Sequence, residues 1–144
     1  MSLLKIAHVP PATVEPGATV LEAVQVMAEE GVGAVSVVEG GQLRGIFTER
    51  DVTLRVVLKS RSPQDTKVAE VMTSPAETAS EVMTAEESMN FMVEHHIRHL
   101  PIVGENGQLL GMLSIRNLLE HMVEDLSREL HSLDQYLLND GPGG

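Results

Sequence analysis

Cysteine and tryptophan are absent from this chain of 144 residues, and its aromatic side chains are two phenylalanines and one tyrosine. Without cysteine the protein can form no disulfide scaffold, no thiolate metal site and no cysteine nucleophile. Hydrophobic residues still make up 42% of the sequence, which is enough for a globular core. Because aromatic residues are so few, we expect that core to be almost entirely aliphatic.

Positive charge is also scarce, since 10 Lys and Arg residues stand against 21 Asp and Glu residues, for a formal net charge of −11. Proteins that bind nucleic acids or anionic membranes cluster basic residues against phosphates, whereas here these residues are scattered. We therefore expect no nucleic-acid partner and no membrane partner. No run approaches the roughly 20 apolar residues of a membrane-spanning helix, and the first residues lack the apolar stretch of a signal peptide. The expected location is the cytoplasm.

Two segments of seven residues share one pattern, GIFTERD at 45–51 and GMLSIRN at 111–117. Each has a glycine, two apolar residues, a hydroxyl residue, two further residues and then Asp or Asn. Sliding the chain along itself by 65 or 66 residues aligns further identical residues. These pairs include Pro10 with Pro75, Thr19 with Thr84, and Gly41 with Gly107. Self-similarity at a fixed offset predicts two copies of one supersecondary unit.

The first copy predicts the element order β-α-β-β-α. Thr19 is the expected N-cap of a helix with Glu22 at the capping-box position, and apolar residues then recur at helical spacing until Gly31. Two β-branched runs joined by a glycine turn within 34–47 predict a hairpin. Thr48 is expected to cap the second helix of the unit.

The second copy repeats this order. Thr84 and Glu87 are the expected capping pair, a hairpin is predicted within 100–113, and Ser114 precedes the last helix. One unit of about 50 residues has too small a core to be stable alone. We therefore expect the two units to pack sheet to sheet as one body.

The tandem unit, with Gly-apolar-apolar-Ser/Thr-x-x-Asp/Asn before each final helix, resembles a pair of CBS domains, the Bateman module. The resemblance implies an α/β (α+β) fold of two β-α-β-β-α repeats packed about a pseudo-two-fold axis, followed by a long C-terminal helix. The expected divisions are repeat 1 at 6–58, a polar linker at 59–70, repeat 2 at 71–123, and a helical extension with a frayed tail at 124–144.

A CBS pair implies a stand-alone regulatory module that binds an adenosyl nucleotide such as AMP, ADP or ATP between the repeats and requires no cofactor. A helix N-terminus suits phosphate, and a carboxylate can hold both hydroxyls of ribose. The resemblance implies that Asp51 marks the stronger half-site and that the uncharged Asn117 marks a weaker one, with Arg98 meeting phosphate. The expected nucleotide-binding residues are Thr13, Val14, Thr48, Arg50, Asp51, Arg98, His99, Ser114, Arg116 and Asn117.

These motifs also have structural alternatives. Thr48 and Asp51 are residues that cap a helix N-terminus, and the basic residues of 95–99 suit the dipole at a helix C-terminus. His95 and His99 have the spacing of zinc ligands on one helix. However, a strand is expected directly after His99, and the sequence lacks the glutamate of an HExxH motif, so metal binding is the weaker interpretation.

No proline or glycine interrupts residues 115–138, which predicts one long helix. Apolar residues recur along it at steps of 4, 3, 4, 3 and 4, which is an a/d seam. These residues are Leu119, Val123, Leu126, Leu130, Leu133 and Leu137. The seam packs either on its own chain or on another chain, and we expect a homodimer or a regulated protein as the partner. A dimeric interaction scaffold without a nucleotide is the alternative function, and no catalytic motif suggests an enzyme.

Overall fold

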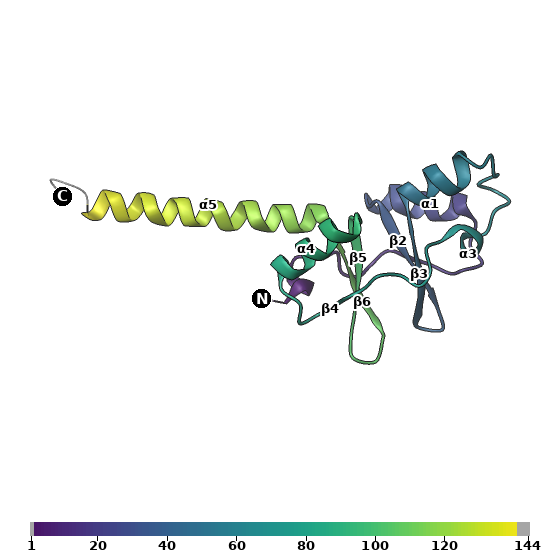
Figure 1. Ribbon diagram of the computed structural model, residues 1–144, viewed down its shortest axis with the longest axis horizontal. Coiled ribbons are helices and arrows are strands. Elements are labelled where there is room, and N and C mark those ends of the chain that lie inside the picture. The colour runs from purple at the N-terminus through teal and green to yellow at the C-terminus, as the bar shows by residue number, and fades with distance from the viewer. Residues whose placement is uncertain (1, 141–144) are drawn as a thin grey trace.

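The computed structural model describes residues 2–140 and contains two three-stranded sheets built in the same way (Figure 1). In each sheet the first strand runs parallel to the second, and the second pairs with the third as an antiparallel hairpin. The first sheet contains β1 (Thr13–Val14), β2 (Ala34–Glu39) and β3 (Gln42–Thr48), and the second contains β4 (Ala79–Ser80), β5 (His99–Val103) and β6 (Leu109–Ser114). Two copies of one unit are therefore confirmed.

The helices begin at the expected caps. Thr19 Oγ1 accepts the N–H of Glu22 at 3.1 Å, and Thr84 Oγ1 accepts the N–H of Glu87 at 3.0 Å. Gly31 ends the first of these helices in the left-handed conformation, with φ at 66°. The helical segments are η1 (Leu3–Lys5), α1 (Val20–Glu30), α2 (Glu49–Asp51), the π-helical η2 (Val52–Val57), α3 (Val68–Val71), α4 (Ala85–His95) and α5 (Ile115–Asp140).

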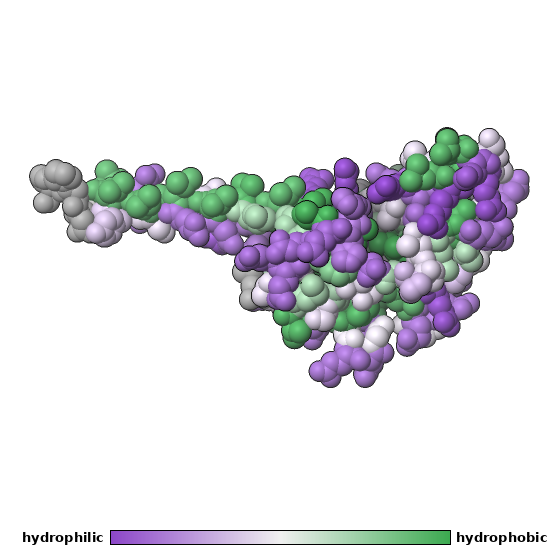
Figure 2. Space-filling view, viewed as in Figure 1, coloured by the Kyte–Doolittle hydropathy of each residue, from purple (hydrophilic) through white to green (hydrophobic). Residues whose placement is uncertain are grey.

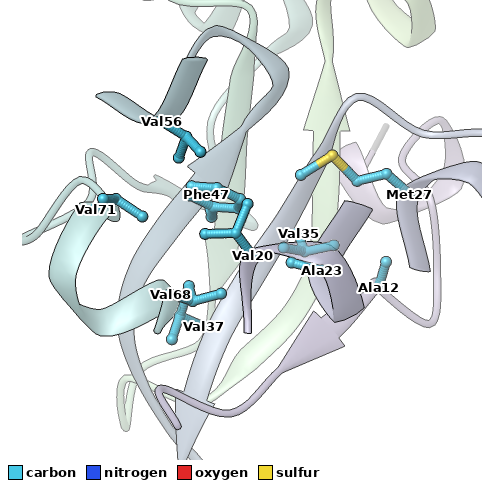
Figure 3. Close-up of a cluster of buried hydrophobic side chains, with 10 residues drawn as sticks. All are labelled: Ala12, Val20, Ala23, Met27, Val35, Val37, Phe47, Val56, Val68 and Val71. Atoms are coloured by element: carbon cyan, nitrogen blue, oxygen red, sulfur yellow. The ribbon is translucent and has the colours of Figure 1, made fainter. Parts of the chain in front are cut away.

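The core of the first unit is aliphatic except for one ring, as the composition predicts (Figure 3). Phe47 of β3 is fully buried among side chains from α1 and β2. Burying one such side chain contributes about 1.5–3 kcal/mol. The buried cluster contains Ala12, Val20, Ala23, Met27, Val35, Val37, Phe47, Val56, Val68 and Val71.

Each segment that precedes a repeat packs on the other repeat. Val68 and Val71 of α3 are buried in the first core, although they stand just before the second repeat. Leu3 of η1 is buried in the second core, although it stands before the first repeat. The linker expected at 59–70 therefore ends in a helix that packs on the first unit. The exchange is reciprocal, as expected of two repeats packed about a pseudo-two-fold axis.

Backbone hydrogen bonds hold both exchanged segments. The N–H and C=O of Thr73 pair with Ile46 at 2.9 Å each, and those of His8 pair with Met112 at 2.9 and 3.1 Å. A Cβ added to Gly45 would lie 2.6 Å from the carbonyl oxygen of Thr73, which explains the first glycine of the repeated phrase. The glycine leaves room for a crossing backbone.

Helix α5 runs without a break through Asp140 and confirms the long C-terminal helix. Its 26 residues span about 39 Å, and most of this length projects away from the sheets (Figure 1). The frayed tail expected from Asn139 is wrong for Asn139 and Asp140, which are helical, and residues 141–144 lie outside the described residues. No helix within residues 2–140 combines the length and the apolar character needed to cross a membrane.

Candidate functional site

A cleft of about 1000 Å³ lies between the two units, at the upper end of the size that small-molecule sites usually have. Residues of α1, α2 and η2 form the wall contributed by the first unit. Residues of β5, β6 and the first turn of α5 form the wall of the second unit. The cleft is therefore shared by both repeats.

All five site residues expected in the second repeat line this cleft. The main-chain N–H of Ile115 donates to the carbonyl oxygen of Arg98 at 2.8 Å, so the start of α5 lies against the start of β5. His99 and Ser114 are paired across the β5–β6 hairpin. The residues brought together are Arg98, His99, Ser114, Arg116 and Asn117.

Ser114 and Asn117 close the first turn of α5. Ser114 Oγ accepts the N–H of Asn117 at 3.1 Å, and Asn117 Oδ1 accepts both the N–H and the hydroxyl of Ser114 at 2.9 Å each. The cap thus uses the oxygen of the Asn117 amide, and its NH₂ group remains available as a donor to a ligand in the cleft.

Thr48 and Asp51 form the same cap in the first repeat, as the structural alternative proposed. Asp51 Oδ2 accepts the N–H of Thr48 at 3.1 Å, and Thr48 Oγ1 accepts the N–H of Asp51 at 3.2 Å. Asp51 Oδ1 also accepts the hydroxyl of Thr73 at 3.2 Å. Arg55 Nε lies 3.6 Å from the same oxygen. Asp51 is only 8% exposed and does not line the cleft.

The three remaining expected residues lie elsewhere. Thr13 and Val14 line a separate cavity of about 680 Å³ beside the β2–β3 turn. Arg50 Nη1 donates to the carbonyl oxygen of His96 at 3.4 Å. This bond joins α2 to the end of α4 and gives Arg50 a structural contact between the units.

The cleft also contains charged residues that the sequence did not indicate. His8 Nε2 contacts Glu30 Oε1 at 3.2 Å across the units, and Glu49 lies on the same wall as α1. His8 belongs to the exchanged N-terminal segment, which no local pattern places near the cleft. Glu49 stands inside GIFTERD, but at a position that the repeated pattern leaves variable.

Arg98 is the cation of the cleft best suited to a ligand. Arg116 Nε is held by Glu120 Oε1 at 3.0 Å, whereas no ion pair among the side chains of residues 2–138 involves Arg98. Burial, with a smaller contribution from the charge of Arg98, lowers the pKa of His99 from its ordinary value of 6.5. His99 is therefore neutral near pH 7, and Arg98 supplies the positive charge there.

The histidines at 95 and 99 do not share a helix. His95 is in α4, where its Nδ1 contacts the carbonyl oxygen of Phe91 at 2.9 Å, whereas His99 is in β5. Among the described side chains, those of residues 2–138, no three of the metal-binding types are grouped closely enough to hold an ion. The i, i+4 spacing of His95 and His99 therefore does not place the two side chains on one face of a helix, as a zinc site of that kind needs.

The CBS domain family model matches residues 5–57 and 68–124, which are the two units of the fold. The chain belongs to the CBS domain family. It is similar to the CBS domain-containing protein YhcV of Bacillus subtilis, with 40% identity over 107 residues that cover 74% of this chain and 75% of that protein.

Two solved structures extend the comparison of this CBS pair. A protein with CBS domains from Burkholderia ambifaria matches with a TM-score of 0.79 at 36% identity, covering 87% of this chain and 96% of the other. A CBS domain protein from Pyrobaculum aerophilum, solved in complex with AMP, matches with a TM-score of 0.74 at 27% identity, covering 81% of this chain and 89% of the other.

Proposed function

We propose that this CBS pair is a stand-alone regulatory module that binds an adenosyl nucleotide in the cleft between its repeats. The observation that carries this proposal is the position of Arg98, a guanidinium without an ion-pair partner in the described chain, in the same cleft as the N-terminus of α5. A planar guanidinium and the positive end of a helix dipole are both suited to phosphate. The AMP complex of the related Pyrobaculum protein supports adenosine as the nucleoside.

Each part of a nucleotide has a matching group in the cleft. Arg98 and the first turn of α5 bind the phosphate, and the NH₂ group of Asn117 donates to a ribose hydroxyl. Val24 and Met27 of α1 offer an apolar surface to the base on the opposite wall. His99, which is neutral, completes the polar wall as a hydrogen-bonding group.

We propose that the half-site at Asn117 is occupied before the one at Asp51. Charge alone favours Asp51, because a carboxylate accepts bonds from two ribose hydroxyls. However, both oxygens of Asp51 already accept bonds from Thr48 and Thr73, so a ribose would have to displace an internal partner. Asn117 reaches the open cleft without such a loss.

We also propose that the cleft prefers a monophosphate to a triphosphate. Its walls carry the carboxylates of Glu30, Glu49 and Glu120. Of the two arginines that line it, Arg116 pairs with Glu120, and Arg98 has no ion-pair partner among the described side chains. Each further phosphate adds negative charge near these acids, and this repulsion is strengthened by the net charge of −11. AMP should therefore bind more tightly than ATP when no divalent cation is present.

We propose that the module acts as a homodimer and without catalysis, changing the angle between its units or subunits when the nucleotide binds. The competing function is an interaction scaffold that needs no nucleotide. The exposed apolar residues of α5 favour this second function as much as the first, because they offer a surface for another chain in either case.

Thermal unfolding with adenosine, AMP, ADP, ATP and GMP separates the two functions. A ligand at 100 times its Kd adds about 2.7 kcal/mol to the free energy of unfolding, which is a clear rise in Tm. We expect AMP to give the largest rise and GMP, the control for the base, to give little. No rise with any adenosine compound would contradict the sensor and favour the scaffold.

A further inference from the structure

The apolar seam of α5 is exposed along its whole length. Its six residues, Leu119, Val123, Leu126, Leu130, Leu133 and Leu137, are between 50% and 63% exposed. In Figure 2 hydrophobic atoms follow one edge of the projecting helix, and hydrophilic atoms follow the opposite edge, on the side where Figure 1 places α4. The chain's own body therefore leaves the seam open, and packing within the chain does not occur.

The seam has the form that another helix covers. Its steps of 4, 3, 4, 3 and 4 place every member on one face, with the a and d positions of a heptad. The same order of steps is obtained when the helix is read in the opposite direction. An antiparallel two-fold pair of helices uses such a surface, because each chain then meets its partner's seam in the reverse order.

We propose that a second copy of this chain covers the seam, with the two α5 helices antiparallel. This proposal deepens the proposed homodimer and is independent of nucleotide binding. The helices would cross near residue 128, so that a and d positions alternate across the interface. The layers would pair Leu119 with the partner's Leu137, Val123 with the partner's Leu133, and Leu126 with the partner's Leu130.

The residues beside the seam favour the antiparallel direction. Met122 and Tyr136, both at g positions, are 45% and 62% exposed and widen the apolar stripe at its two ends. Antiparallel helices bring g positions together, so Met122 would pack on the partner's Tyr136. Parallel helices would instead place Met122 against the partner's Ser127. Antiparallel packing also sets the two helix dipoles head to tail.

Acidic residues flank the seam in either direction. In the antiparallel pair Glu129 would face the partner's Glu129, and Glu120 would face the partner's Asp134. In a parallel pair Glu129 would face the partner's Asp134. These contacts are exposed to solvent and are screened by salt. Self-association should therefore strengthen as ionic strength rises, whereas a basic partner protein would bind more weakly.

Disulfide cross-linking can show whether the two α5 helices run parallel or antiparallel. The parent chain contains no cysteine, so only introduced cysteines can form a disulfide. A disulfide requires Cα atoms within about 7 Å. Residues 119 and 137 are 18 positions apart, or about 27 Å along the helix. Leu119→Cys and Leu137→Cys proteins should each fail to cross-link alone and should form a disulfide dimer when mixed. Cross-linking of each variant with itself would show parallel helices and overturn the proposal.

Light scattering on a second pair of variants tests the interface itself. Leu126→Glu with Leu130→Glu should convert the dimer to monomer and leave unfolding of the sheets unchanged, since both residues are exposed beyond the body. Leu138→Glu is the matched control, because Leu138 is 81% exposed and lies off the seam. A dimer that survives the double substitution would show that the seam is not the dimer interface, although the protein would still be a homodimer. A monomeric parent protein, or a dimer weakened by salt, would overturn the inference.

Discussion

The hydroxyl of Thr73 donates to Oδ1 of Asp51 at 3.2 Å, although the two residues are 22 positions apart. Asp51 ends the seven-residue motif of the first unit. Thr73 belongs to the segment that leads into the second unit and pairs with Ile46 of β3. One carboxylate therefore caps a helix and also fastens the exchanged segment. The two roles of Asp51 can be separated by two different substitutions.

Asp51→Asn and Asp51→Ala should differ in stability and agree in binding. Asn117 shows that an amide oxygen can accept both cap bonds, and the new NH₂ group can donate to the hydroxyl of Thr73, which can also act as an acceptor. Asp51→Asn loses only the contact of Arg55 with a carboxylate, so it should lose less stability than Asp51→Ala. Asp51→Ala removes the cap and leaves Thr73 without its acceptor, which should lower the free energy of unfolding by about 1–3 kcal/mol. Urea denaturation measures both changes.

The affinity of these two variants for AMP tests the role of Asp51 implied by the family resemblance. We expect calorimetry to give nearly the parent Kd for both, because Asp51 lies outside the cleft wall. Asn117→Ala should weaken binding more than either. A loss of more than tenfold in folded Asp51→Asn would instead assign the ribose to Asp51, since a charge-assisted bond contributes about 1.5–3 kcal/mol.

Arg98→Ala should weaken binding of AMP much more than binding of adenosine. The guanidinium is proposed to meet phosphate, so its loss matters only for a ligand that carries one. The expected loss for AMP is tenfold or more, which corresponds to about 1.4 kcal/mol. Arg44→Ala is the control, because Arg44 pairs with Glu39 on the β2–β3 hairpin and does not line the cleft. Equal losses for AMP and adenosine would contradict the phosphate role.

Gly45→Ala should destabilise the protein strongly. The new Cβ would lie 2.6 Å from the carbonyl oxygen of Thr73 and 2.9 Å from the sulfur of Met72, so the crossing backbone would have to move. Overpacking of this kind typically costs about 1–3 kcal/mol. Gly17→Ala is the matched control, because a Cβ there meets nothing within 4 Å. Similar Tm values for the two variants would show that the crossing segment tolerates displacement.

The protein should lose stability as pH falls below about 6.5, and His99 should carry part of this loss. The pKa of His99 is lowered from 6.5 in the folded state, chiefly by burial and then by Arg98, so the unfolded chain binds this proton more readily. The loss begins near pH 6.5 and continues down to the lowered folded pKa. His99→Gln should flatten the stability curve in this window when urea unfolding is measured between pH 7.5 and 5.5.

Much of the architecture can be predicted from the sequence because it depends on local chemistry. Thr19 and Thr84 cap their helices through bonds to residues three positions away, and the glycine turns join neighbouring strands. Because these local signals occur twice in the sequence, they predict the two units, the strand order within each unit and the resemblance to the CBS family. The heptad steps of α5 likewise depend only on helical periodicity, so the long helix and its apolar seam follow directly from the residues.

The candidate site required the tertiary structure because its parts are distant in sequence. The exchanged segments bring His8 against Met112 and Thr73 against Asp51, and no local pattern encodes either contact. The two copies of the seven-residue motif therefore differ in the folded protein. Asn117 lines the cleft, whereas Asp51 is buried against Thr73 of the crossing segment. Capping chemistry alone makes these two positions equivalent. Both units receive a crossing segment, but Thr73 of one segment bonds to Asp51, whereas His8 of the other contacts Glu30, and only the tertiary structure shows this difference.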